Sequence, residues 1–217
     1  MSNVIENLER LNRKERFFLV GMALGNPQFR LETEFRKELD SQFHLTIPED
    51  AFVAMDYHLN WIYAACALTL EQPVQNRIYK NVDRVIDSTQ EDVDLLVSYQ
   101  DPSGMCHLIM LEAKGVTAFS NRQFKHKIER FKQIFRDDGK RWPRVTPHFG
   151  LVSPNQSKAL DYDICPSWLK VNGKVPWFKM NIPKNRLVLF GCDGQGMPDQ
   201  ERPFWTVKGS LAGLMYG

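Results

Sequence analysis

The sequence lacks the patterns that identify several common functional sites. Its four cysteines, Cys66, Cys106, Cys165 and Cys192, are widely spaced, with no C-x-x-C pair and no paired histidines. This spacing indicates neither a structural zinc site nor a disulfide framework. The glycine-rich segment 191–196 has neither the P-loop pattern nor the dinucleotide-binding pattern, so we expect an ordinary loop after a strand there.

Long apolar stretches are also missing. The sequence contains no run of about eighteen apolar residues, so we expect no transmembrane helix and no membrane partner. Charges at Glu6, Glu9 and Arg10 argue against a signal peptide, and we expect a cytoplasmic protein. The length of 217 residues suits one core. We expect a main domain over 48–217 and an N-terminal helical extension over 1–47.

Apolar residues at helical spacing predict three helical segments in the first third of the chain. Residues 3–24 form the first segment, which ends at Gly25-Asn26-Pro27. One or two helical turns are expected over 33–39. Pro48 favours the first turn of a longer helix that reaches about Leu70.

The middle of the chain has the pattern of a β-hairpin. Two apolar runs, 95–97 and 108–111, flank Asp101-Pro102-Ser103-Gly104, whose Pro and Gly suit a tight turn. Further strands are expected at 77–86, 148–152 and 186–190. Together with the helices, these strands predict an α/β fold with a mixed central sheet flanked by helices.

Charged residues lie where the two strands of this hairpin begin and end. Glu112 and Lys114 share one face of the second strand, because side chains alternate along a strand. Asp94, at the start of the antiparallel first strand, should lie near Glu112. Two close carboxylates repel each other unless a cation lies between them, and hard oxygen ligands favour Mg²⁺ or Mn²⁺. Asp92 shares the parity of Asp94 and is the alternative ligand.

These residues resemble the signature of the PD-(D/E)xK, or restriction-endonuclease-like, nucleases. In that signature an aspartate, a hairpin and a Glu-x-Lys on the adjacent strand follow one another. Asp94, Glu112 and Lys114 match it, whereas Val93 stands where the signature has proline. The resemblance covers roughly residues 48–152. It implies a metal-dependent nuclease, most simply a DNA endonuclease, in which the lysine orients the attacking water.

The resemblance implies two further site residues. A glutamine is often found near the start of the helix after the lysine strand, and Gln123 occupies that position. Gln123 would position the water or contact the nucleic acid, or else serve as a helix cap or surface amide. An acidic residue on the preceding helix often adds a metal contact, and Asp56 is preferred over Glu49 and Glu71. The alternative is that Asp56 is a cap or bridges to a buried histidine or arginine.

An amphipathic helix is predicted between Asn121 and Arg136, with an apolar stripe that includes Phe124 and Phe131. Its other faces are basic, although the whole chain has a net charge of only +2. Such a local field attracts a phosphate backbone. Four residues are expected to bind nucleic acid: Arg122, Lys125, Lys127 and Arg130. The alternative is a solvated helix face.

Three functional hypotheses follow from the sequence. The first is the nuclease, and the second is a nucleic-acid-binding or scaffolding module that uses the same fold without cleavage. In the third the motif is accidental, and Glu112 and Lys114 form a surface ion pair of little energetic value. Cutting both strands of a duplex often needs two active sites, which makes a homodimer one expected arrangement.

Overall fold

The computed structural model describes residues 3–70, 78–81, 84–88, 91–115, 117–183 and 187–209. The chain divides into two compact units, Met1–Met180 and Asn181–Gly217. This division differs from the expected one, which separated 1–47 from the rest. The N-terminal residues Val4 and Leu8 are buried in the same core as the central sheet, so the first helix is part of the larger unit.

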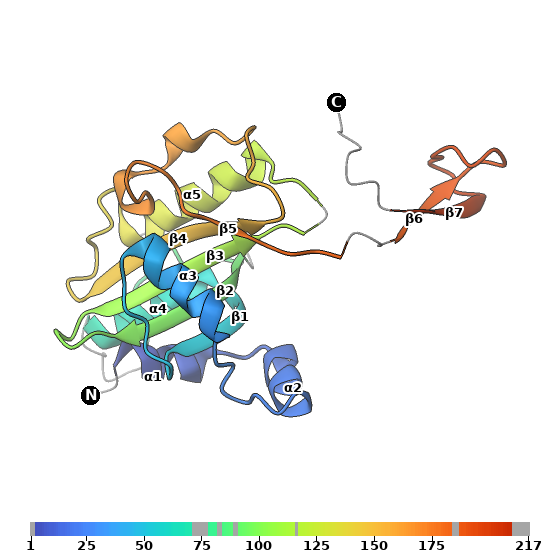
Figure 1. Cartoon of the computed structure of the whole chain (residues 1–217). Helices are drawn as coiled ribbons and strands as arrows, with labels where there is room; N and C mark the ends of the chain where they lie inside the picture. The colour runs from blue at the N-terminus through green and yellow to red at the C-terminus, as the bar shows by residue number, and fades with distance from the viewer. Residues whose placement is uncertain are drawn as a thin grey trace. The chain divides into compact units, whose positions relative to one another are not determined.

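A five-stranded mixed sheet forms the centre of the larger unit (Figure 1), with the order β1-β2-β3-β4-β5. Antiparallel pairing joins the first three strands to one another: β1 (Phe52–His58), β2 (Asp92–Gln100) and β3 (Cys106–Ala113). Strands β4 (Val145–Ser153) and β5 (Trp177–Lys179) continue the sheet in parallel pairing. The expected hairpin and mixed sheet are confirmed.

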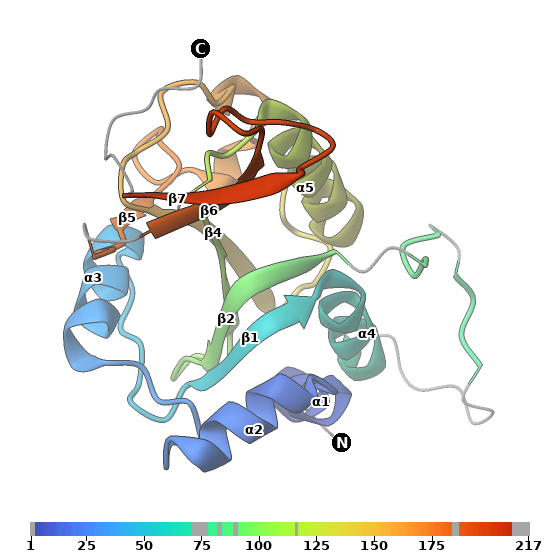
Figure 2. The same ribbon diagram turned by 90° about the vertical axis from the view of Figure 1, so that its right-hand side faces the viewer.

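Helices cover both faces of this sheet (Figure 2). Helices α4 (Leu59–Leu70) and α5 (Asn121–Phe135) lie on one face, and α3 (Thr33–Phe43) lies on the other. Alternate residues of β3 fill the two cores. Leu108 and Met110 pack on the α4 and α5 side, whereas Ile109 and Leu111 pack with residues of α3. Among the described residues no helix is both long and apolar enough to span a bilayer.

The helix expected from Pro48 to Leu70 is wrong in its first half. Residues 52–58 form strand β1, and the helix begins only at Leu59. Leu59, Tyr63 and Cys66 keep helical spacing in the observed helix. The residues before Leu59 do not continue this helix, because residues 53 and 54 pair with β2. Tyr57 is fully buried, and its hydroxyl donates to the carbonyl of Leu8 at 2.8 Å.

The strand expected at 77–86 is also absent where it can be checked. Residues 78–81 and 84–86 contain no strand, and residue 77 lies outside the described residues. Strand β1 takes the place beside β2 that this segment was expected to occupy. Both wrong expectations, the helix from Pro48 and the strand at 77–86, have the same cause: residues 52–58, which pair with β2, were assigned to a helix.

The N-terminal segment forms two helices instead of one, α1 (Val4–Leu11) and α2 (Glu15–Ala23). Between them the side-chain oxygen of Asn12 accepts a hydrogen bond from the backbone N–H of Lys14 at 3.2 Å. An asparagine that bonds nearby backbone competes with helical hydrogen bonding. Helix α1 packs against α4, and α3 continues four residues beyond the expected turns, to Phe43.

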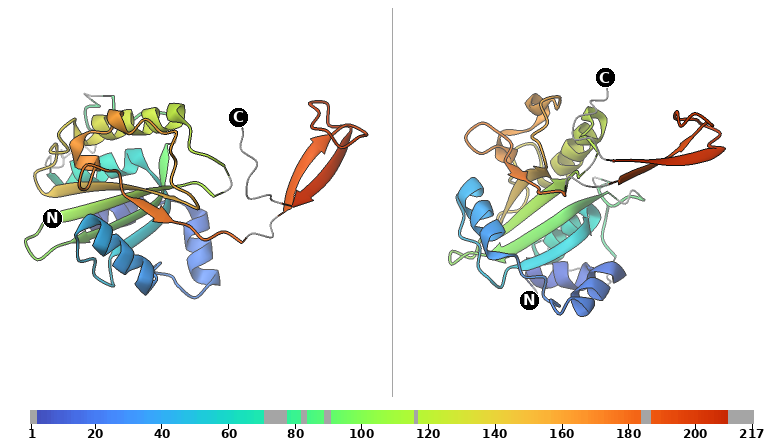
Figure 3. Two further views of the ribbon diagram at one scale, coloured as in Figure 1. Left: turned by 45° about the horizontal axis from the view of Figure 1, so that its top comes forward. Right: turned by 45° about the vertical axis from the view of Figure 1, so that its right-hand side comes forward.

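The smaller unit contains an antiparallel pair of strands, β6 (Leu187–Cys192) and β7 (Phe204–Gly209), which form a twisted ribbon (Figure 3). The strand expected at 186–190 is found as β6, apart from residue 186, which lies outside the described residues, but β6 pairs with β7 in a separate sheet and not in the central one. After β6 the chain turns at Asp193, whose carboxylate accepts backbone hydrogen bonds from Gln195 and Met197 at 2.9 Å.

Candidate active site

Asp94 and Glu112 face each other across the hairpin. The register pairs Leu95 with Leu111, so the next positions outward along the two strands are Asp94 and Glu112. Residues directly opposite in an antiparallel pair have their side chains on the same face. That face is the one covered by α5, because Met110 belongs to the core on that side. The structure thus brings together the two carboxylates that the sequence placed side by side.

The carboxylate of Glu112 lies between two ammonium groups. Nζ of Lys114 is 3.2 Å from Oε1, and Nζ of Lys127 is 3.2 Å from Oε2. Lys114 directly follows β3, and its backbone N–H donates to the carbonyl of Val152 at 2.9 Å, which extends the pairing with β4. Lys127 comes from α5, is only 8% exposed and also donates to the carbonyl of Asp92. Two strands and a helix therefore meet at this carboxylate.

Asp94 is held by the backbone of the neighbouring strand. Its Oδ2 accepts a hydrogen bond from the N–H of Ala113 at 2.6 Å. Burial raises the pKa of Asp94, and the nearby charge of Glu112 raises it further, although the Ala113 hydrogen bond and the two lysines act in the opposite direction. A carboxyl group whose ionised form is disfavoured by burial and by a second carboxylate gains stability when a cation is close.

A cavity of about 210 Å³ opens beside these groups. Glu112, Lys114, Gln123 and Lys127 line it together with residues at the start of α5. The N-cap of α5 is Ser120, whose hydroxyl accepts the N–H of Gln123 at 3.3 Å. The positive end of the helix dipole is therefore located at the cavity, where it favours an anion. A larger cavity of about 350 Å³, at α2 and the start of β1, contains none of the expected site residues.

The structure does not bring Asp56 into this group, whereas Glu91, which directly precedes β2, lines the cavity together with Glu112. Asp56 lies on strand β1, not on a helix, and its φ of 50° interrupts the pairing with β2. Its carboxylate is 3.2 Å from Nη2 of Arg16, whose side chain is exposed, whereas the alternative to metal binding was a bridge to a buried histidine or arginine.

The other acidic candidates have partners of their own or cannot be placed. Glu49 pairs with Arg30 at 3.2 Å, and the carboxylate of Asp92 pairs with Lys14 at 3.3 Å. Glu71 lies outside the described residues. Within the described ranges, no group of three or more His, Cys, Asp or Glu side chains is arranged to hold a metal ion.

Only two of the four expected nucleic-acid-binding residues of α5 face solvent. Arg122 and Lys125 are exposed, whereas Lys127 and Arg130 are 8% and 5% exposed. The sequence contained a signal for Lys127, because this residue comes three positions after Phe124 and four before Phe131. That spacing places it on the buried face of the helix.

Arg130 has a structural role instead of the expected contact with nucleic acid. Its Nη2 donates to the side-chain oxygen of Asn60 and to the carbonyl of Val85, and it lies 3.7 Å from Asp87. Its Nη1 donates to Gln133 at 2.8 Å. The guanidinium thereby attaches α5 to α4 and to the segment 84–88.

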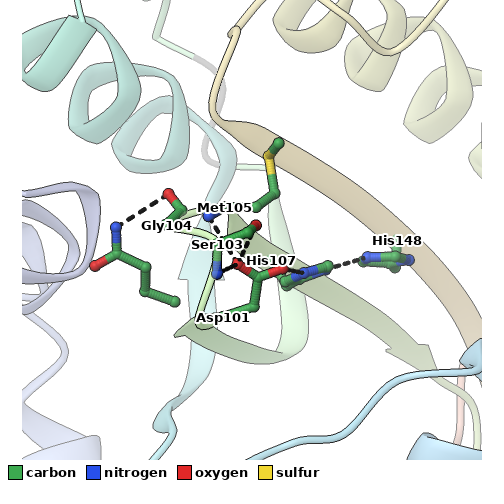
Figure 4. A network of polar contacts seen from close by, with 7 residues as sticks. Asp101, Ser103, Gly104, Met105, His107 and His148 are labelled. Carbon is green, nitrogen blue, oxygen red and sulfur yellow. Dashed lines mark hydrogen bonds and ion pairs between the residues drawn. The ribbon is translucent and has the colours of Figure 1, made fainter.

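A second polar group lies at the turn end of the hairpin (Figure 4). Oγ of Ser103 donates to Oδ1 of Asp101 at 2.6 Å, and Oδ2 of Asp101 is 3.3 Å from Nε2 of His107. Nδ1 of His107 is 3.0 Å from Nε2 of His148 on β4. The serine hydroxyl is bonded to the carboxylate and not to an imidazole, unlike an activated serine nucleophile. This group fastens the turn to β4.

No family model, no curated protein and no solved structure matches this chain. The assignment of a function therefore depends on the geometry and chemistry of the residues described above.

Replacing Arg130 by leucine should destabilise the fold. Arg130→Leu leaves the buried carbonyl of Val85 without its donor, so we expect the free energy of unfolding to fall by about 2–4 kcal/mol. The matched control is Arg122→Leu on the exposed face of the same helix. This substitution should change the free energy of unfolding by less than about 0.5 kcal/mol. Urea denaturation measures both, and equal effects would contradict a structural role for Arg130.

His148 should make stability depend on pH. Burial and the neighbouring His107 lower the pKa of His148 from 6.5 to about 4. The unfolded state therefore binds more protons than the folded state between these values, and stability present above pH 6.5 is lost as the pH falls towards 4. His148→Gln does not titrate but can still bond to His107. Denaturation at several pH values should show that the variant loses about 2 kcal/mol less unfolding free energy than the wild type between pH 6.5 and pH 4. If the variant and the wild type lose stability equally over this range, His148 is not the cause.

Proposed function

We propose that this protein is a metal-dependent nuclease with a restriction-endonuclease-like fold, which hydrolyses phosphodiester bonds in nucleic acid as a DNA endonuclease. The observation that supports it is the arrangement around Glu112. This carboxylate faces Asp94 across the hairpin, has Lys114 and Lys127 on its two oxygens, and lines a cavity at the start of α5.

The carboxylate pair fits one Mg²⁺ or Mn²⁺ ion. Mg²⁺ is commonly bound by one or two carboxylates, with waters and substrate phosphate oxygens as its other ligands. The raised pKa of Asp94 fits as well, because a cation compensates for the burial of its charge. Asp94 and Glu112 would hold the ion, helped by the carbonyl of Ala113, the residue between Glu112 and Lys114. A bound ion would supply an acidified water and neutralise charge on the phosphate.

The two lysines have different tasks in this proposal. Lys127 is buried and bonded to both Glu112 and the Asp92 carbonyl, so it fixes the carboxylate in place. Lys114 is more exposed and lines the cavity. Its ammonium group orients the attacking water and stabilises the additional negative charge that develops on the phosphate during attack.

The surroundings of the cavity suit a nucleic-acid backbone. A cavity of about 210 Å³ is smaller than the roughly 300–1,000 Å³ typical of small-molecule pockets, but a single phosphate of a polymer needs less room. The N-terminus of α5 attracts that phosphate, and the exposed Gln123, Arg122 and Lys125 lie on the same helix. Cutting both strands of a duplex would require two such sites, one from each copy in a homodimer.

A non-catalytic nucleic-acid-binding module is the second candidate. It is favoured by two observations: both oxygens of Glu112 are paired with ammonium groups, and within the described ranges no three His, Cys, Asp or Glu side chains are arranged to hold a metal ion. The third hypothesis, a plain surface ion pair, fits less well. Glu112 is partly buried and bonded on both sides, which is unlike an exposed pair of little energetic value.

Cleavage assays test the proposal. Supercoiled DNA, linear DNA and RNA are incubated with the protein and Mg²⁺ or Mn²⁺, and we expect cutting that EDTA stops. Lys114→Ala should lower the rate at least about 100-fold, because it removes the group that stabilises the developing charge. Lys37→Ala, at an exposed lysine of α3 on the other face of the sheet (Figure 2), is the control and should retain most of the activity. Inert protein that still binds DNA with a steep salt dependence would favour the binding module.

Metal binding tests the ligand assignment separately. Asp94→Asn should weaken Mn²⁺ binding at least about tenfold in titration calorimetry, because it removes one of two carboxylate ligands. Asp56→Asn should leave the affinity within about twofold, since the Asp56 carboxylate is bonded to Arg16. Equal losses in the two variants would show that the ion is held elsewhere.

A further inference from the structure

The larger of the two cavities described above lies away from Glu112 and has the size of a small-molecule pocket. Its volume is about 350 Å³, within the roughly 300–1,000 Å³ typical of such pockets. We call it the α2 cavity. Its lining comes from α1 and α2, from the segments that follow these two helices, and from residues 50–53. All of these residues belong to the larger unit, so the cavity is formed within that unit.

Aromatic rings form much of the apolar lining. Phe17, Phe18 and Phe52 all line the α2 cavity. The ring of Phe17 stacks on that of Phe29 at 4.3 Å with an interplanar angle of 22°, and Phe18 meets Phe17 edge to face at 5.3 Å. Gly21 permits this packing, because a Cβ atom there would lie 3.0 Å from Cε2 of Phe29. Rings that are already packed in this way lose little conformational freedom when a planar ligand stacks on them.

One polar side chain of the lining is buried and has an unused donor. Asn12 lines the cavity and is only 6% exposed. Its side-chain oxygen accepts the backbone N–H of Lys14 at 3.2 Å, which fixes the orientation of the amide. The amide nitrogen Nδ2 is buried and has no hydrogen-bond partner within the described ranges. A buried donor without an acceptor is unfavourable, so a ligand that brings an acceptor atom to Asn12 would be stabilised.

The charged residues of the lining favour N–H donors on the ligand. They are two acidic residues, Glu9 and Asp50, and one basic residue, Arg30. Arg30 is already bonded to Glu49 at 3.2 Å and to Gln28 at 3.0 Å. In the described part of the chain, neither of the two acidic side chains has an ion pair or a hydrogen bond of its own. Free carboxylates accept hydrogen bonds from N–H groups and repel a phosphate.

A nucleobase combines the properties that this lining requires. It has flat faces that stack on aromatic rings, and its ring nitrogens and carbonyl oxygens can accept from Nδ2 of Asn12. Adenine, cytosine and guanine also carry an exocyclic amino group, whose N–H bonds suit a carboxylate. An apolar ligand would leave the Asn12 donor unpaired, and a ligand bound through its phosphate would meet two carboxylates and only one arginine.

We propose that the α2 cavity binds a nucleobase that carries an exocyclic amino group, which stacks on Phe17 and Phe18 and accepts a hydrogen bond from Asn12. The base can belong to a free nucleoside or to an unpaired nucleotide of a nucleic acid, because the recognised chemistry is the same. Binding requires neither a metal ion nor cleavage. It is measured in EDTA, so the failure of this proposal and the failure of the nuclease proposal are distinguishable.

The test is titration calorimetry of the full chain in EDTA with four probes. Adenosine should show saturable binding. Adenosine 5′-monophosphate should bind no more tightly, because the charged lining is mainly acidic. Uridine lacks the amino group and should bind at least about tenfold more weakly than adenosine. A short single-stranded oligodeoxyadenylate tests the second source of the base. If it binds and adenosine does not, the cavity takes a base of the polymer.

Two variants and a matched control locate the binding. Phe18→Ala removes a stacking surface and should weaken binding at least about tenfold. The control is Leu19→Ala, an exposed apolar residue of the same helix that does not line the cavity, and it should change the affinity by less than about twofold. Asn12→Asp keeps the oxygen that accepts from Lys14 but removes the amide donor, and it should weaken binding at least about tenfold. Thermal unfolding without ligand shows whether each variant is folded.

Three results would overturn the proposal. The first is a folded wild type that binds neither adenosine nor the oligonucleotide. The second is uridine that binds as tightly as adenosine, because the amino group would then not be recognised. The third is equal affinity in Phe18→Ala and Leu19→Ala, because the ligand would then be bound elsewhere.

Discussion

The candidate active site depends on the ion pairs that Glu112 makes with Lys114 and Lys127. A partly buried carboxylate is unfavourable unless cations and hydrogen bonds compensate for its lost hydration. Lys114 provides this from the end of β3 itself, and Lys127 provides it from α5 while also bonding to the carbonyl of Asp92 at the start of β2. A shift of α5 would leave a buried charge unpaired. The same contacts that orient Glu112 therefore hold the helix in place on the sheet.

Helix α5 contributes to the core and to the site through different parts of its surface. Phe124 and Phe131 pack in the core on the α5 side of the sheet, and the first turn opens into the cavity. Lys127 and Arg130 lie at the border of the apolar face, where each is bonded to another element of the fold. The helix thus offers fewer free cations to a ligand than its composition suggests. The attraction of an anionic ligand therefore depends more on the charge close to the cavity and on the helix dipole than on the total number of basic residues in α5.

Features that depend on nearby residues were predictable. The turn at 101–104 fixes the hairpin, and the period of the apolar residues fixes the helix that follows it, so both are found where the sequence places them. Strand β1 was missed because its conformation is set by pairing with β2, about forty positions away. The break between α1 and α2 was missed; there the side-chain oxygen of Asn12 accepts a hydrogen bond from the backbone N–H of Lys14, a local contact that apolar periodicity does not reveal.

For the site, the sequence by itself determined that Asp94 and Glu112 face each other, because a hairpin with a short turn allows only one register that buries its apolar residues. It also determined that Glu112 and Lys114 share a face. Only the tertiary structure decided that Asp56 bonds to Arg16 and that Lys127 points inward to Glu112. Those contacts join residues on different elements, and the free energy of burying and pairing a charge depends on where the folded chain places its partner.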